Sequence, residues 1–155
     1  MLDRAWLLAH IPHQGDMCLL DTVLEFDPQH IRCRAVSHRD PANPLRHAGR
    51  LGVACGIEYA AQAMAAHGAA MAELGGDARP RAGFLASVRG VELRVDRLDD
   101  VAADLEVEAE RLSGDSNNIL YAFSVRAAGQ TLLSGRAAVI LDAGRLAGSP
   151  TGVTA

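Results

Sequence analysis

The stretch from Leu51 to Leu74 constrains the fold more than any other part of this 155-residue chain. It is rich in alanine, glycine, valine, isoleucine and methionine, it is long enough for a six-turn helix, and two glycines, Gly75 and Gly76, follow as a stop signal. A helix that is apolar around most of its circumference must be covered on several sides. The pattern therefore predicts one central helix, and its many small side chains would let a sheet approach it closely.

Strand-like runs lie on both sides of this helix. A short helix is expected over 2–9, and 37–50, which contains two prolines and no periodicity, is expected to be a loop. The run 101–112 has the clearest period of two, because its apolar and acidic residues alternate. This order predicts an α+β fold in which an antiparallel sheet curls around the helix, with the last four strands in a meander. The six expected strands are 17–26, 29–36, 82–95, 101–112, 117–128 and 130–141.

Composition excludes several classes of protein. Apolar residues make up 49% and charged residues 22% of the chain, as in an ordinary globular domain. The net charge of −4 gives no general attraction to nucleic acid or to an anionic membrane, and no apolar run is long enough to cross one. We expect a single cytoplasmic domain over 1–142 and a flexible tail over 143–155.

No cofactor or metal site is expected. The three cysteines, Cys18, Cys33 and Cys55, are odd in number and show no CxxC pattern, which disfavours a disulfide framework and a structural zinc site. No histidine and carboxylate group has the spacing of a metal site, and no glycine-rich phosphate loop is present.

Glu58 interrupts the apolar helix. Burying a carboxylate without a partner is costly and raises its pKa, so such a residue either reaches solvent or is kept for chemistry. Gln62 follows four positions later and therefore lies on the same helix face. Because carboxylates with perturbed pKa values are enriched at functional sites, we expect Glu58 to belong to one.

Three stretches resemble the hotdog-fold 3-hydroxyacyl-(acyl carrier protein) dehydratases, and especially the short dehydratase-like proteins of aryl-polyene-type pathways. IPHQGDMCLLDTVLEFD (11–27) resembles the opening of that family, with a Pro-His pair before an apolar strand. GIEYAAQAMAAHG (56–68) resembles the start of its central helix, and GFLASVRGVELRV (83–95) the strand after it. The resemblance implies a hotdog fold and a dimer with two sites at its interface.

The resemblance also implies a division of labour between residues. Glu58 matches the family's helix carboxylate, which works with a histidine from the loop before the helix of the other chain. The family carries that histidine in a Gly-His-Phe-Pro-Gly loop, whereas this chain has PLRHAGRLG, in which His47 is the sole candidate. Gln62 and His13 are expected to line the substrate pocket.

Dehydration of a 3-hydroxyacyl thioester needs a base, an acid and a group that stabilises the enolate. We expect His47 to be the base, and Glu58, protonated because its pKa is raised by desolvation, to be the acid. The start of the helix would stabilise the enolate through free N–H groups. Three glycines leave backbone amides open there and are expected to bind substrate: Gly49, Gly52 and Gly56.

Three functions remain compatible with these residues. The first is a dehydratase acting on thioesters of acyl carrier protein or coenzyme A in fatty-acid or polyene-type biosynthesis. The second is a thioesterase in which the carboxylate activates water. The third is a non-catalytic or half-catalytic subunit that pairs with another hotdog chain. Arg46 and Arg50 flank the predicted site and could meet phosphopantetheine or an acidic carrier protein.

Overall fold

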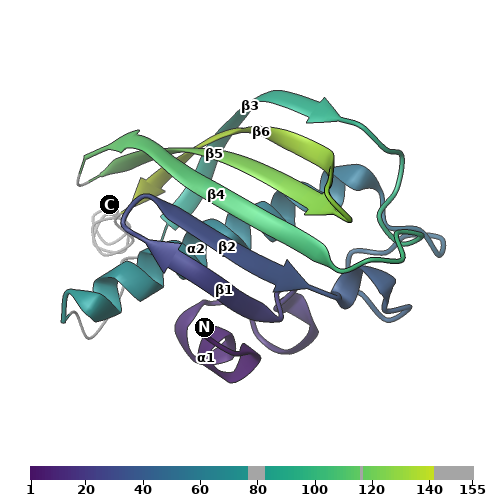
Figure 1. The fold of residues 1–155 in the computed structure, drawn as a ribbon, viewed down its shortest axis with the longest axis horizontal. Coiled ribbons are helices and arrows are strands. Elements are labelled where there is room, and N and C mark those ends of the chain that lie inside the picture. Colours follow the sequence, from purple (N-terminus) through teal and green to yellow (C-terminus); the bar gives the residue numbers. More distant parts are fainter. Residues whose placement is uncertain (77–82, 116, 142–155) are drawn as a thin grey trace, which may run out of the picture.

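A computed structural model describes residues 1–76, 83–115 and 117–141. The central helix α2 (Gly56–Leu74) lies across one face of a curved six-stranded antiparallel sheet, and the short helix α1 (Arg4–His10) packs beside it (Figure 1). This confirms the predicted α+β hotdog architecture. The predicted flexible tail lies outside the described residues. The strands are β1 (Thr22–Asp27), β2 (His30–Ala35), β3 (Gly83–Leu93), β4 (Leu105–Gly114), β5 (Asn118–Ala127) and β6 (Gln130–Leu141).

The strand order in the sheet is β1-β2-β4-β5-β6-β3. Strands β4 to β6 form the expected meander, but β3 does not pair with β4 and instead lies at the far edge, against β6. The connection after β3 is held at the start of the central helix, because Val53 N–H donates to the Asp96 carbonyl (3.1 Å) and Leu98 N–H to the Leu51 carbonyl (2.7 Å). The prediction of a four-stranded meander was therefore wrong for β3.

Both ends of the predicted helix are close to their expected places. A 3₁₀ turn, η3 (Val53–Cys55), precedes α2, and the helix ends where Gly75 N–H bonds to the Met71 carbonyl at 3.0 Å. Gly76 has a φ of 84°, a conformation that glycine adopts without strain. Within the described part of the chain, no helix has the length and apolar character needed to cross a membrane.

The segment 17–21 was wrongly predicted as the start of a strand. It follows a 3₁₀ turn, η1 (Gly15–Met17), and β1 begins only at Thr22. Side chains occupy the backbone groups that strand pairing would need: Arg4 takes the carbonyls of Cys18 and Leu20, and Gln62 takes the N–H of Leu19. The local pattern of apolar residues does not indicate that distant side chains will bind these backbone groups in place of a neighbouring strand.

Gly56 allows α2 to pack closely against the sheet. A Cβ at this position would lie 2.5 Å from Cδ2 of Leu133, which is fully buried. We therefore expect Gly56→Ala to destabilise the protein by roughly 1–3 kcal/mol through overpacking. Gly68→Ala is the matched control, because Gly68 lies in the same helix with no atom within 4 Å of its added Cβ.

Urea unfolding of the two variants checks this prediction. Gly68→Ala should raise stability by up to about 1 kcal/mol, since alanine has the higher helix propensity. If Gly56→Ala is as stable as Gly68→Ala, the close contact does not limit the packing of α2.

Candidate functional site

The structure brings His13 and Glu58 together. Glu58 lies in the first turn of α2, and His13 lies in the loop that follows α1. His13 Nε2 is 3.5 Å from Glu58 Oε1, and the two side chains are 24% and 40% exposed. This separation is long for a hydrogen bond, but contacts in ligand-free sites often tighten when substrate binds. The pair thus combines a nitrogen base with a carboxylate at a solvent-accessible position.

The pKa of Glu58 is lowered, contrary to the expectation from sequence. Hydrogen bonding from His13 is the largest cause, and it opposes the desolvation that would raise the pKa; the charge of His13 and a hydrogen bond from Gln62 lower it further. The sequence left open whether the carboxylate reaches solvent, and the structure shows that part of this side chain is exposed. Glu58 is therefore an ionised carboxylate near neutral pH and not the protonated acid that we expected.

The ionised carboxylate of Glu58 determines which ring nitrogen of His13 carries the proton. A carboxylate only accepts hydrogen bonds, so we assign the ring proton of His13 to Nε2. In the neutral ring Nδ1 then carries a lone pair. This atom is buried and has no hydrogen-bond partner in the described part of the chain. An imidazole that is oriented by a carboxylate and has an unused nitrogen is suited to act as a general base.

Gln62 holds the loop that carries His13. Its side chain is fully buried. Its Oε1 accepts from Leu19 N–H at 2.8 Å, and its Nε2 donates to the Met17 carbonyl at 2.8 Å. The amide thus satisfies two backbone groups of the loop from its position one helical turn after Glu58. We had expected Gln62 to bind substrate, but these contacts make it a positioning residue.

Arg4, which lies in α1, also binds the backbone of this loop. Its guanidinium donates to the carbonyls of Gly15 (3.0 Å), Cys18 (2.8 Å) and Leu20 (2.9 Å). This role could not be predicted from the sequence, because an arginine in a short helix is normally a solvated surface residue. Together Arg4 and Gln62 hold the loop from two helices.

Gln62→Leu is expected to destabilise the protein by about 2–4 kcal/mol, because it leaves the buried Leu19 N–H and the partly buried Met17 carbonyl without their partner. Urea unfolding measures this loss. The matched control is Gln14→Ala, which removes an exposed glutamine that also donates to backbone carbonyls near this loop, those of Leu8 and Ile11. The control should lose less than about 1 kcal/mol. Equal losses would mean that Gln62 does not anchor the loop.

His47 lies in a tight, exposed turn. His47 and Arg50 exchange both backbone hydrogen bonds, at 2.8 and 3.0 Å, and the two residues between them have positive φ, 53° at Ala48 and 77° at Gly49. Among the described residues the His47 side chain makes no hydrogen bond or ion pair, so the structure of one chain does not bring it to Glu58. Its role as a base across a subunit interface stays a prediction.

The predicted backbone donors are partly engaged. Gly56 N–H bonds to the carbonyls of Val53 and Ala54 inside the turn that precedes α2. Gly56 therefore has a packing role and no free N–H for a thioester oxygen. Gly52 forms an isolated bridge with Arg97, and the Gly49 carbonyl accepts from Arg46. No contact in the described structure links Gly49 or Gly52 to Glu58.

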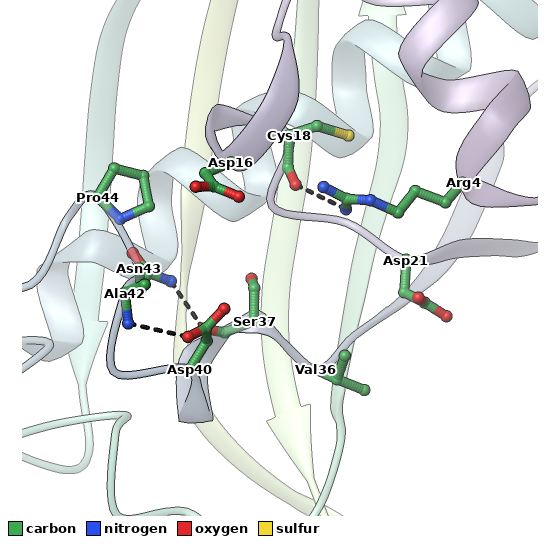
Figure 2. A pocket seen from close by; sticks show the side chains of 10 residues that line it. All are labelled: Arg4, Asp16, Cys18, Asp21, Val36, Ser37, Asp40, Ala42, Asn43 and Pro44. Carbon is green, nitrogen blue, oxygen red and sulfur yellow. Dashed lines mark hydrogen bonds between the residues drawn. The ribbon is translucent and has the colours of Figure 1, made fainter.

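A cavity of about 290 Å³ lies between the loop of residues 16–21 and the segment 36–44. Figure 2 shows Asp16, Asp21 and Asp40 around it. Burial is the main cause that raises the pKa of the Cys18 thiol, which keeps it protonated and unreactive. Because neither His13 nor Glu58 lines this cavity, it is not the candidate site.

Comparison with known proteins agrees with this architecture. The chain aligns with one chain of the dehydratase heterocomplex ApeI:P from Xenorhabdus doucetiae with a TM-score of 0.81 and 22% identity, covering 90% of this chain and 92% of the other. A hypothetical thioesterase with coenzyme A from Streptococcus pneumoniae aligns with a TM-score of 0.54 and 11% identity, covering 77% and 84%. Both likenesses concern the fold.

The family assignment rests on the sequence. No curated protein matches it. The family model described as ApeP dehydratase matches residues 7–145, which include the second half of α1, the His13 loop, α2 and the whole sheet. This chain therefore belongs to the ApeP-like dehydratase family.

Proposed function

We propose that this chain dehydrates 3-hydroxyacyl thioesters carried by acyl carrier protein to trans-2-enoyl thioesters, in fatty-acid or polyene-type biosynthesis. The observation that carries the proposal is the His13–Glu58 pair, in which the carboxylate orients an imidazole whose Nδ1 is unused. Membership of a dehydratase family supports the reaction class. The cytoplasmic location expected from the sequence stays a prediction.

In the proposed reaction His13 moves one proton. For this step substrate binding must uncover Nδ1, which is buried in the free chain. Nδ1 then takes the proton from C2 of the substrate, and the electron pair of that C–H bond moves onto the thioester oxygen as an enolate. The enolate collapses to the C2–C3 double bond as the C3–O bond breaks. The imidazolium then gives the proton to the departing hydroxyl, which leaves as water. Glu58 stays ionised, holds the ring through Nε2 and stabilises its positive charge. The N-terminal end of α2 favours the negative charge that develops on the thioester oxygen.

We propose that a second hotdog subunit associates with this chain by pairing along the open edge of β3. This strand pairs on one side only, with β6, and so leaves one row of backbone groups open. Helix α2 packs against β1, β2, β4 and β5, whereas apolar side chains of β3 remain open: Leu85 is 41% and Leu93 50% exposed. The likeness to the ApeI:P heterocomplex supports a different hotdog chain as partner, with a homodimer as the other possibility.

This pairing keeps open the function of a half-catalytic subunit. In that case Glu58 and His13 would complete a site shared with the partner, or the partner would supply the base. A thioesterase remains chemically possible, but no contact at the site favours it over dehydration.

The first experiment follows the ultraviolet absorbance of a crotonyl or longer enoyl thioester as the double bond is hydrated in the reverse reaction. The protein is assayed alone and mixed with a second hotdog subunit, with coenzyme A and carrier-protein substrates. Loss of absorbance is the expected result. Activity only in the mixture would establish a half-catalytic subunit. No change in any mixture, or release of free thiol without hydration of the double bond, would contradict the dehydratase proposal.

A further inference from the structure

Two arginines face each other on neighbouring strands at the edge of the sheet. Arg89 of β3 and Arg136 of β6 are register partners, and both are exposed. Within the described part of the chain, neither lies within ion-pair distance of a carboxylate. Like charges directly opposite one another destabilise a sheet, and no ion pair among the described residues offsets the cost of this pair to folding.

The arginines at the other end of the same sheet face are neutralised. Arg32 lies 3.3 Å from both Glu25 and Glu106, and Arg34 lies 2.6 Å from Asp21. The whole chain has a net charge of −4, so two adjacent arginines form a locally positive spot on a chain that is acidic overall. Their positive potential is directed outward.

Apolar side chains continue the same surface. Residues two apart on a strand share a face, so Arg136 is followed on this face by Ala138 and Ile140. Ile140 is 37% exposed and pairs with Phe84 of β3, which is 50% exposed. The arginine row and this apolar row are four residues apart on β6, about 13 Å at the usual strand rise.

A shallow cavity of about 370 Å³ borders this surface on the β5 side. Leu120 of β5, which is 36% exposed and opposite Ala138, forms part of its lining. We define the outer-face patch as these arginine and apolar rows: Phe84, Arg89, Leu120, Arg136, Ala138 and Ile140.

We propose that the outer-face patch docks the acidic carrier protein that delivers the acyl substrate. The proposal rests on the proposed function, which supplies a carrier-linked substrate. A surface with positive charge at one end and apolar side chains at the other fits an amphipathic helix that presents carboxylates beside apolar residues. The charges would steer the encounter and fix its orientation, and burial of the apolar rows would hold the complex. Pairing along β3 uses backbone groups and would leave these side chains accessible.

The proposal is tested with the double variant Arg89→Ala/Arg136→Ala. The control is Arg126→Ala, which removes one positive charge from β5, outside the outer-face patch. The dissociation constant is measured against an acyl carrier protein loaded with a 3-hydroxyacyl chain, at low and at physiological salt. The double variant should bind about tenfold more weakly at low salt and lose most of the salt dependence of the wild type, because surface charges are screened by ions.

Enzyme kinetics give an independent readout. For the carrier-linked substrate KM should rise with kcat unchanged, whereas an N-acetylcysteamine thioester, which lacks the carrier, should show the wild-type KM. Gel filtration verifies that association with other subunits is unaltered. Unchanged carrier binding in the double variant, or an equal loss in Arg126→Ala, would overturn the proposal. So would a loss in Arg50→Ala alone, because it would place the docking surface at the exposed turn near His47.

These outcomes separate the proposal from the proposed function. Lack of turnover of the small thioester by wild type and its partner mixture would contradict dehydration. Binding of the loaded carrier would still show whether the outer-face patch is the docking surface.

Discussion

His13→Ala is expected to lower kcat/KM for enoyl thioester hydration by about 10²–10⁴-fold, the usual contribution of a general base. Among the described residues, His13 is the one imidazole in contact with Glu58, and the substitution removes it. Glu58→Gln should also lower the rate, because a neutral amide no longer stabilises the imidazolium. The loss of ultraviolet absorbance measures both variants, assayed under the conditions in which the wild type is active.

His47→Ala is the matched control for this experiment. His47 is an exposed histidine in a turn, and its removal should leave the rate within a few-fold of wild type if His13 is the base. The opposite pattern, with His47→Ala inactive and His13→Ala active, would show that the base comes from that turn across a subunit interface. Thermal unfolding of each variant verifies that a loss of rate is not a loss of fold.

The elements whose signals are local in sequence were predicted well. The central helix follows from its composition and from the two glycines that end it. The alternation in β4 is equally clear, because Leu105, Val107 and Ala109 are buried while the acidic residues between them remain partly or fully exposed. In both cases the distribution of apolar residues directly indicates which face of the element is buried.

The features that depend on distant parts of the chain were not predicted. The position of β3 at the edge is set by pairing with residues of β6 that follow at least 40 positions later, and by the bonds that hold the next connection at the helix start. A continuous run of strands in the sequence cannot distinguish this arrangement from a simple meander. The non-local contacts of Arg4 and Gln62 likewise overrode the local apolar pattern of 17–21.

The site was predicted in part for the same reason. Composition identified Glu58, because a carboxylate in an apolar helix is unusual, and the family resemblance pointed to His13. The distance between them could not be predicted, because it depends on the path of the loop. The sign of the pKa shift of Glu58 depends on that path as well: without His13 the desolvation would have raised the pKa.

His67 is a histidine of α2 whose contacts are structural. It lies nine residues after Glu58 in the sequence of α2. The structure places it in the core, where Nδ1 lies 2.8 Å from the hydroxyl of Tyr121 and Nε2 lies 2.8 Å from the Asp27 carbonyl. Burial lowers the pKa of His67, so the ring stays neutral and joins α2 to two parts of the sheet.

The second large effect is expected at the edge strand. Leu85→Lys/Leu93→Lys should abolish the association of subunits, whether with a second copy or with another hotdog chain. Both leucines lie on the face of the sheet that carries α2, because their partners on β6, Val139 and Leu133, pack in the core. A strand exposed on both faces with an open backbone edge is a template for pairing, and charges there are how natural proteins block it. Since each leucine is at least 41% exposed within one chain, the fold of the chain itself should be retained.

Sedimentation velocity measures the mass of the wild type and the variant, alone and mixed with the partner chain. The matched control is Leu74→Lys, which introduces the same charge at a 70% exposed leucine at the end of α2. The wild type and the control should form the dimer, and the double variant should remain monomeric with unaltered circular dichroism. A dimer of the double variant would mean that the subunits meet elsewhere. If the wild type is monomeric both alone and with the partner chain, the proposed pairing along β3 is contradicted. Because the acyl site of this family is expected at that interface, loss of the dimer should also remove enoyl hydration, while leaving the His13–Glu58 contact within each chain.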